Sequence, residues 1–318
     1  MKSQLYPDKN PMDSLKQELN HILDIIPKGS KIAYLEYPVY GNVGDILIMK
    51  GTEVFFSENN MHVIRRHSFH DFPPNIRFPS DSILVFQGGG NLGDLYGRHQ
   101  EMREYFINRY KKHRIVILPQ TIYFRNPENL DRVSQIFRGH PDLHIFTRDK
   151  KSFSIARQHF GENVYLTPDM AHFLWPIKVS NSQKSGHLHL LRTDIERCNA
   201  VLLNSNSEEH ITDWPGLISQ WENLVIRIIV EMHRRNRNLH IFPARSLWYI
   251  LSQHLVNKSI NFFAQYSFIK TSRLHGHILA CLMNIPNLLL DNSYGKNNMY
   301  YETWTFRVPY AKFENRKK

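Results

Sequence analysis

Cysteine is scarce in this sequence. Its 318 residues include only two cysteines, Cys198 and Cys281, which are too few to build a disulfide framework. This scarcity favours a reducing compartment, and the apolar neighbours of Cys281 predict a buried thiol. The first residues lack the apolar stretch of a secretory signal, and no apolar run approaches the ~18 residues that a membrane-spanning helix needs. We therefore expect a cytoplasmic protein.

Several motifs of enzyme chemistry are also absent. The chain contains no H-E-x-x-H, no C-x-x-C, no G-x-S-x-G and no G-x-x-x-x-G-K-[ST], which leaves zinc proteolysis, acyl hydrolysis and ATP hydrolysis without support. His187 and His189 alternate along an expected strand, but no third zinc ligand is evident. We expect no metal site.

Acidic residues are outnumbered by basic ones. The formal net charge is +11 and the isoelectric point is about 9.5, which favours acidic partners. The basic residues are scattered and form no stripe interleaved with aromatics, so nucleic acid is not expected. A charged substrate and an anionic membrane surface are both compatible with this charge. Hydrophobic residues make up 42% of the chain, which predicts a packed core.

Apolar runs that suit strands alternate with helical patterns along the chain, as in parallel sheets covered by helices. The first half has expected strands at 31–37, 62–66, 82–87, 114–118, 144–146 and 164–166. After a polar linker at 176–186, the second half has expected strands at 188–191, 239–242, 268–270 and 287–290. We expect two α/β domains, residues 1–178 and 179–318, with residues 1–12 as a loose lead-in.

A glycine-rich run at residues 88–94 follows the strand expected at 82–87. Gly88, Gly90 and Gly93 match the dinucleotide fingerprint G-x-G-x-x-G, which expects an acid at the end of the next strand. No acid follows the strand at 114–118, so we interpret the run as a flexible ligand loop and not as an NAD site. Asp94 could orient a substrate hydroxyl or cap a helix.

The residues from Thr271 to Gly276 lie between an expected strand and the helix expected from His275 onward. Such a turn lies at the carboxyl end of a parallel strand, where open α/β sheets bind ligands. Arg273 could bind a phosphate or carboxylate with two bonds, and His275 could transfer a proton near neutral pH. A surface arginine and a capping histidine are the structural alternative. Arg148 follows another strand and is a second candidate for anion binding.

Several stretches, in this order, resemble the polysaccharide pyruvyl transferases. They are GNVGD at 41–45, QGGGNLGDLY at 87–96, ILPQT at 117–121, TRDKKSF at 147–153, LTPDMAHFL at 166–174, LLRTDIE at 190–196, TSRLHGHILA at 271–280 and NIPNLLLDNSYGKN at 284–297. The stretch TSRLHGH is the most specific of them, whereas the glycine loops alone would be weak. The resemblance covers nearly the whole chain.

The resemblance implies two Rossmann-like domains with parallel sheets, similar to GT-B glycosyltransferases, with the active site in the cleft between them. It implies that phosphoenolpyruvate donates pyruvate to a sugar diol of a cell-surface or exopolysaccharide precursor, giving a cyclic ketal and phosphate. The N-terminal domain would bind the acceptor and the C-terminal domain the donor. The acceptor could be a lipid-linked oligosaccharide at the inner face of the cell membrane, and no cofactor is implied.

The resemblance and the residue chemistry together predict the site residues. His275, Arg273 and Asp94 are expected to be catalytic, with His275 moving a proton as either base or acid. The expected substrate-binding residues are Arg148, Lys296, Asp45, Asn42, Gly90, Asn91, Ser272 and Leu274. Two alternatives stay open, a glycosyltransferase that uses a nucleotide sugar and a carbohydrate-binding relative without turnover.

Overall fold

The computed structural model describes residues 10–73, 75–179, 185–194, 209–239, 241–292 and 295–314. Its strands form two sheets, and every pairing between described strands is parallel. The expected α/β class with two parallel sheets is therefore confirmed. Cys198 and part of the expected lead-in and linker lie outside the described residues.

The first sheet has seven strands in the order β2-β1-β3-β5-β6-β7, with β4 paired to β5. Apolar runs place both faces of its central strands in the core, and β6 is buried throughout. The strands are β1 (Lys31–Leu35), β2 (His62–His67), β3 (Ile83–Phe86), β4 (Gly89–Gly93), β5 (Ile115–Tyr123), β6 (Leu143–Thr147) and β7 (Val164–Leu166). The connecting helices are α2 (Val43–Glu58), α3 (Gly97–Arg109), α4 (Pro127–Arg138) and α5 (Lys150–His159).

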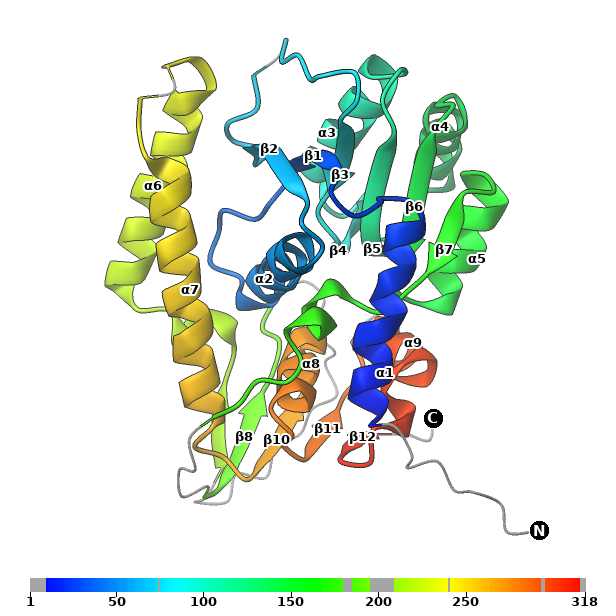
Figure 1. The fold of residues 1–318 in the computed structure, drawn as a ribbon. Helices are drawn as coiled ribbons and strands as arrows, with labels where there is room; N and C mark the ends of the chain where they lie inside the picture. The colour runs from blue at the N-terminus through cyan, green and yellow to red at the C-terminus, as the bar shows by residue number, and fades with distance from the viewer. Residues whose placement is uncertain are drawn as a thin grey trace, which may run out of the picture.

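The second sheet has five strands in the order β12-β11-β10-β8-β9 and lies below the first in Figure 1. Its strands are β8 (His187–Leu190), β9 (Glu209–Thr212), β10 (Phe268–Thr271), β11 (Asn287–Leu289) and β12 (Ala311–Phe313). The helical segments of this half are η3 (Trp214–Leu217), α6 (Gln220–Leu239), α7 (Ala244–Phe263), α8 (Leu274–Leu282), α9 (Lys296–Thr303) and η4 (Thr305–Arg307). Helices α6 and α7 run side by side along one edge of the molecule.

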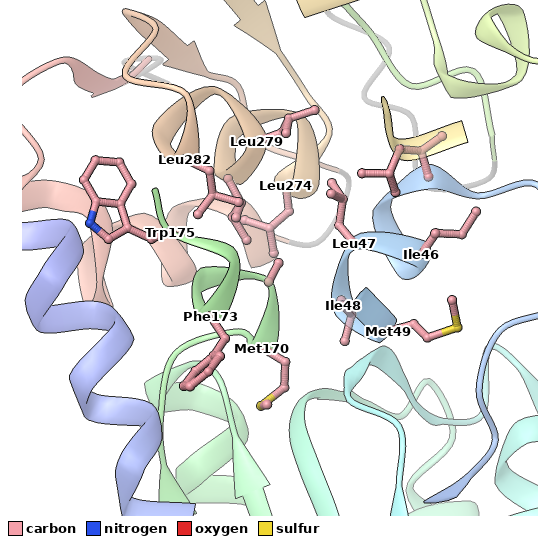
Figure 2. Packing of buried hydrophobic residues seen from close by; sticks show 14 of the residues in the cluster. Ile46, Leu47, Ile48, Met49, Met170, Phe173, Trp175, Leu274, Leu279 and Leu282 are labelled. Atoms are coloured by element: carbon pink, nitrogen blue, oxygen red, sulfur yellow. The ribbon is translucent and has the colours of Figure 1, made fainter. Parts of the chain in front are cut away.

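One apolar core joins the two halves. Helix α2 contacts α7, α8 and the short helix η2 (Met170–Leu174). Figure 2 shows Leu274 and Leu282 of α8 above η2, with Leu47 of α2 beside Leu274 and the Phe173 ring of η2 pointing away from α8. These buried side chains belong to a single cluster that includes residues of both sheets. The two sheets are therefore held together by one shared apolar core. The domain boundary expected between residues 178 and 179 stays a prediction.

The first helix begins earlier than the sequence pattern suggests. The apolar spacing of Leu15, Leu19, Ile22, Leu23 and Ile26 predicts a helix over residues 14–26, with Ser14 and Gln17 as a capping box. Instead, Asn10 caps α1 (Pro11–Glu18) by accepting a hydrogen bond from the Met12 N–H, and a proline occupies the first turn. The chain continues as the 3₁₀ segment η1 (Leu19–Asp24).

The prediction of a strand at residues 239–242 is wrong. Helix α6 continues to Leu239, and residues 241–243 connect it to α7. The Asn236 side chain closes this connection, because it accepts from the Phe242 N–H at 2.9 Å and donates to the Phe242 carbonyl at 2.7 Å. The apolar residues that resemble a strand therefore belong to a helix–helix junction.

The glycine run at 88–94 also differs from the expectation of a flexible loop. Residues 89–93 form β4, which pairs with β5. Gly93 has a φ of +136°, and a Cβ there would collide with the Tyr123 carbonyl, so only glycine suits this pairing. Gly90 and Asn91 are consequently held in a fixed strand.

Candidate functional site

A cavity of about 310 Å³ is lined by residues from both halves of the chain. Its volume lies at the lower end of the range for small-molecule sites. The lining residues are Tyr40, Asn42, Asp45, Phe69, Gly90, Asn91, Tyr96, His99, Arg148, Arg192, Trp214, Arg273, Leu274, His275 and Lys296. Most of the residues predicted for the site are among them, and Ser272 and Asp94 are not.

Helix α2 presents Asp45 to the cavity from its first turn. The cap of α2 is Asn42, whose side chain accepts a hydrogen bond from the Gly44 N–H, so Asp45 is a first-turn acid and not the cap. The Asn42 amide donates to Asp45 Oδ2 at 2.8 Å, and the Tyr40 hydroxyl donates to the same oxygen at 3.1 Å. Burial and the Asp45 charge raise the pKa of Tyr40 well above its usual value, which keeps its hydroxyl protonated as a donor.

The Asp169 carboxylate joins the Arg148 guanidinium and the His275 imidazole, which were predicted from separate motifs. Arg148, which follows β6, donates through Nη1 to Asp169 Oδ2 at 2.5 Å. His275, in the first turn of α8, has its Nε2 3.3 Å from the same oxygen. Arg148 is further fixed by Thr121, whose Oγ1 accepts from the guanidinium Nε at 2.9 Å. All these groups except the partly exposed His275 are buried.

The surroundings of Asp169 keep its carboxylate ionised. Burial by itself would raise the pKa of Asp169, but the charge and hydrogen bond of His275 and the charge of Arg148 outweigh it, and the pKa falls well below its usual value. The Ala171 N–H also donates to Asp169 Oδ1 at 2.9 Å. The ionised Asp169 carboxylate lies next to the imidazole and orients the ring of His275.

Asp169 was not among the predicted site residues. It stands directly after β7 in the stretch LTPDMAHFL, where it caps η2. An acid that follows a parallel strand lies at the same sheet edge as Arg148, and this position was the available signal. Its partnership with His275 spans 106 residues of sequence and depends on how the two sheets pack.

Two glycines let the backbone approach the reactive side chains. A Cβ on Gly44 would lie 2.7 Å from His275 Nδ1. A Cβ on Gly90 would lie 2.7 Å from Arg148 Nη2 and 3.8 Å from Lys296 Nζ. Two cationic groups therefore converge on the bare backbone at Gly90, where a side chain would fill the space in front of them.

Arg273 is enclosed by carboxylates. Its Nε and Nη2 each donate to one oxygen of Asp213 at 2.6 Å, and its Nη1 donates to Asp194 Oδ2 at 2.7 Å. Arg192 also binds Asp194, through Nε and Nη2. Arg273 thus lines the cavity as part of an ion-pair network, in which Asp213 is buried and Asp194 is exposed. The expected two-bond contact of Arg273 with an anion stays a prediction. The Ser272 Oγ accepts from the Arg192 N–H at 2.8 Å and supports this network from outside the cavity lining.

Asp94 organises a loop away from the cavity lining. Its two carboxylate oxygens accept from the N–H groups of Arg125 and Asn126, each at 2.8 Å. Burial acts against ionisation, but these backbone hydrogen bonds and that of the Asn129 amide lower the pKa of Asp94. This geometry is closer to the structural role, at the start of a helix, that the sequence analysis gave as the alternative for Asp94. No described contact connects Asp94 with the cavity residues. Its catalytic role stays a prediction.

A buried carboxylate also holds His99 at the cavity, and the sequence offered no clear signal for it. Glu36 Oε1 lies 2.6 Å from His99 Nδ1 and accepts from Arg103 Nη2 at 2.7 Å. Arg103 in turn donates to the carbonyl of Asn91, which fixes the strand beside the cavity. His99 is a second imidazole that can reach a bound ligand.

In the part of the chain that the structure describes, no group of three or more His, Cys, Asp or Glu side chains is arranged to hold a metal ion. His189 instead lies 3.8 Å from Glu209 across neighbouring strands.

Comparisons with known proteins agree on a family. The family model described as polysaccharide pyruvyl transferase matches residues 42–294. A Bacillus subtilis (strain 168) protein named "Putative pyruvyl transferase EpsO" is 43% identical over 303 residues, which cover 95% of this chain and 94% of that protein. "Pyruvyl transferase 1" of Schizosaccharomyces pombe is 27% identical over 288 residues, covering 86% of this chain and 69% of that protein.

A solved structure supports the fold. The crystal structure of an uncharacterized protein from Klebsiella pneumoniae matches with a TM-score of 0.65 and 24% identity, covering 95% of this chain and 99% of that chain. At this identity the likeness concerns the architecture alone.

Proposed function

Because the chain belongs to the polysaccharide pyruvyl transferase family, we propose that its cavity takes phosphoenolpyruvate as donor and transfers pyruvate to a sugar diol. The product would be a cyclic ketal on a cell-surface or exopolysaccharide precursor, and phosphate would be released. The observation that carries this proposal is the sharing of Asp169 Oδ2 by His275 and Arg148 at the cavity wall.

Donor binding is assigned to the cations near Gly90. Phosphoenolpyruvate carries a carboxylate and a phosphate, so it needs fixed positive charges and backbone N–H donors. Arg148 and Lys296 face the space in front of Gly90. Arg148 donates through Nη1 to Asp169, and its Nη2 points toward Gly90. The donor would lie against these two groups.

His275 is assigned the proton transfers. A first sugar hydroxyl adds to C2 of the donor. His275 gives a proton to C3, which becomes the methyl group, and takes up the proton that the hydroxyl oxygen loses, so this addition leaves the ring as it was. The second hydroxyl then bonds to C2 as the C2–O bond to phosphate breaks, and its proton leaves with the products. Asp169 Oδ2, 3.3 Å from His275 Nε2, orients the ring for these proton transfers. Asp45, held by Asn42 and Tyr40, would orient the acceptor hydroxyls.

The acceptor is proposed to be a sugar of a growing polysaccharide, carried as a lipid-linked oligosaccharide at the inner face of the cell membrane. Tyr40, Phe69, Tyr96 and Trp214 line the cavity, and aromatic faces of this kind pack against sugar rings. A cytoplasmic location would give the protein access to phosphoenolpyruvate.

The proposal is tested by incubating the protein with phosphoenolpyruvate and a panel of defined sugars. We expect phosphate release that depends on the acceptor, and a sugar product whose mass has increased by one pyruvate ketal. Transfer from a nucleotide sugar without any reaction of phosphoenolpyruvate would instead indicate a glycosyltransferase. Sugar binding without turnover of either donor would indicate a non-catalytic relative.

A further inference from the structure

Helices α6 and α7 expose large apolar side chains to solvent. On α6, Trp221, Leu224, Val225 and Ile228 recur at the spacing of one helical face, and Trp221 is 77% exposed. On α7 and the preceding connection, Leu247, Ile250 and Ile241 are exposed, the last two by 70% and 68%. The two helices contact each other and form one edge of the molecule (Figure 1). We call these seven residues the α6–α7 apolar face.

The same two helices are basic. Helix α6 carries Arg227, Arg234, Arg235 and Arg237 against Glu222 and Glu231, and α7 carries Arg245 and Lys258 without any acid. Apolar side chains that are flanked by arginines are typical of helices that lie in the interface of an anionic bilayer. Tryptophan prefers the level of the lipid headgroups, which suits the exposed position of Trp221 at the start of α6.

We propose that the α6–α7 apolar face docks the protein onto the surface of an anionic phospholipid bilayer. Each exposed apolar side chain gains free energy by leaving water, and each nearby arginine gains from the negative surface potential of the lipid. The protein lies on the bilayer and does not cross it, since no helix within the described ranges is both long and apolar enough to serve as a membrane span.

Charge complementarity favours a lipid surface over a second copy of this chain. A two-fold symmetric dimer through this face would place the same arginine-rich helices against each other. Like charges that meet across an interface weaken association, whereas anionic lipid headgroups neutralise them. The net charge of +11 for the whole chain acts in the same direction.

Helix α6, which carries part of the α6–α7 apolar face, also packs against a loop that lines the cavity. A Cβ on Gly41 would lie 2.8 Å from Ile218 and 3.3 Å from Ile226 of α6, so the loop of Tyr40 and Asn42 packs directly on the helix. His233 of α6 also lies 2.8 Å from the Tyr37 hydroxyl through Nε2. Docking through α6 would therefore hold the cavity next to the lipid surface, where a lipid-linked acceptor resides. This last step rests on the proposed function, while the docking itself does not.

The full-length protein is tested by sedimentation with phosphatidylcholine vesicles that contain about 30% phosphatidylglycerol. We expect it to bind these vesicles at least about tenfold more tightly than vesicles of phosphatidylcholine alone. The triple variant Trp221→Ser, Ile228→Ser, Ile250→Ser should lose at least about tenfold in affinity for the anionic vesicles. Phe306→Ser is the matched control, because Phe306 is another exposed apolar side chain but lies outside α6 and α7. Circular dichroism checks that all variants are folded.

Trp221 also reports on the contact itself. The difference between the emission spectra of the wild type and Trp221→Phe should shift to shorter wavelength when anionic vesicles are added. The proposal is overturned if the wild type ignores these vesicles, if Phe306→Ser weakens binding as much as the triple variant, or if light scattering shows a dimer that the triple substitution abolishes. None of these readouts depends on pyruvyl transfer, so the failure of one proposal leaves the other intact.

Discussion

Asp169 Oδ2 is the point where a guanidinium and an imidazole from opposite halves of the chain meet. The carboxylate is buried and stays ionised because Arg148 and His275 lie next to it. The charge on this oxygen therefore determines the orientation of the imidazole and of the guanidinium. Two predictions concern single residues around it.

Replacing His275 by alanine should remove proton transfer without unfolding the protein. We expect kcat for pyruvyl transfer to fall by about 10²- to 10⁴-fold, the usual contribution of a general acid–base group. His254→Ala is the control, since this side chain is largely exposed on α7. Phosphate release is measured with phosphoenolpyruvate and an accepted sugar. Turnover close to that of the wild type would remove His275 from the mechanism.

Gly90→Ala should interfere with donor binding. The new Cβ would lie 2.7 Å from Arg148 Nη2, so the guanidinium has to move or the methyl group occupies the donor position. We expect kcat/KM for phosphoenolpyruvate to fall by about 10- to 100-fold, because small displacements of reacting groups are costly. Gly97→Ala is the matched control, since its nearest neighbour is the Glu101 side chain at 3.8 Å. Equal kinetics for the two variants would place the donor elsewhere.

At the level of elements, Arg273 connects β10 and α8 to the loops that follow β8 and β9. It does so through Asp213, which is buried, and through Asp194. Arg273→Ala would leave the Asp213 carboxylate buried without its ion-pair partner. The free energy of unfolding should therefore drop by about 3–5 kcal/mol, as measured by urea denaturation.

The double variant Arg273→Ala, Asp213→Asn separates this cost from a role in donor binding. Removing the stranded charge should restore part of the stability. If Arg273 also binds the donor, KM for phosphoenolpyruvate should stay raised in the double variant. A KM equal to that of the wild type would restrict Arg273 to holding the network together.

Local sequence patterns could predict most elements because apolar periodicity and turn residues act over a few residues. At residues 239–242 the apolar pattern predicts a strand, but Ile241 and Phe242 belong to the connection between α6 and α7. The short edge strands β9 and β12 were missed, because their stability comes from pairing with β8 and β11.

The site was predictable where a motif carried the residue, as for Arg148 and His275. The sequence did not predict three carboxylates, because each of them binds a partner from a distant part of the chain. They are Asp169, Asp213 and Glu36. Only the order of strands in the sheets and the packing between the sheets bring these carboxylates to the cations. That information is not contained in any short segment.

For the whole molecule, the shared core predicts cooperative unfolding. Helix α2 belongs to the first half by sequence, yet it packs against α7 and α8 of the second half. Urea transitions followed by circular dichroism and by tryptophan fluorescence should therefore coincide. A fragment of residues 1–178 should show no cooperative transition. Two separate transitions, or a fragment that folds stably, would show that the halves are independent.

Stability should also decrease as the pH is lowered from about 6.5 to 4. Burial lowers the pKa of both His172 and His277 to about 4, below the value of about 6.5 in the unfolded chain. Between these values the unfolded state binds more protons, so each histidine contributes a slope of up to about 1.4 kcal/mol per pH unit.

His172→Phe tests this dependence. Neither ring nitrogen of His172 has a hydrogen-bond partner among the described residues, and the ring stacks on Tyr300. Phenylalanine should keep the stability near pH 7 while reducing the slope between about pH 6.5 and pH 4, as measured by urea denaturation over that range. An unchanged slope would show that His172 is protonated to the same extent in both states.

The packing of α2 between the two sheets limits how a ligand can enter. Separation of the two halves would move Leu47 of α2 away from Leu274 of α8 and expose their apolar surfaces to water. We therefore do not expect the two halves to open about a hinge. Substrates should come and go through movements of the surrounding loops and side chains, over a rigid frame that keeps the catalytic groups in register throughout the reaction cycle.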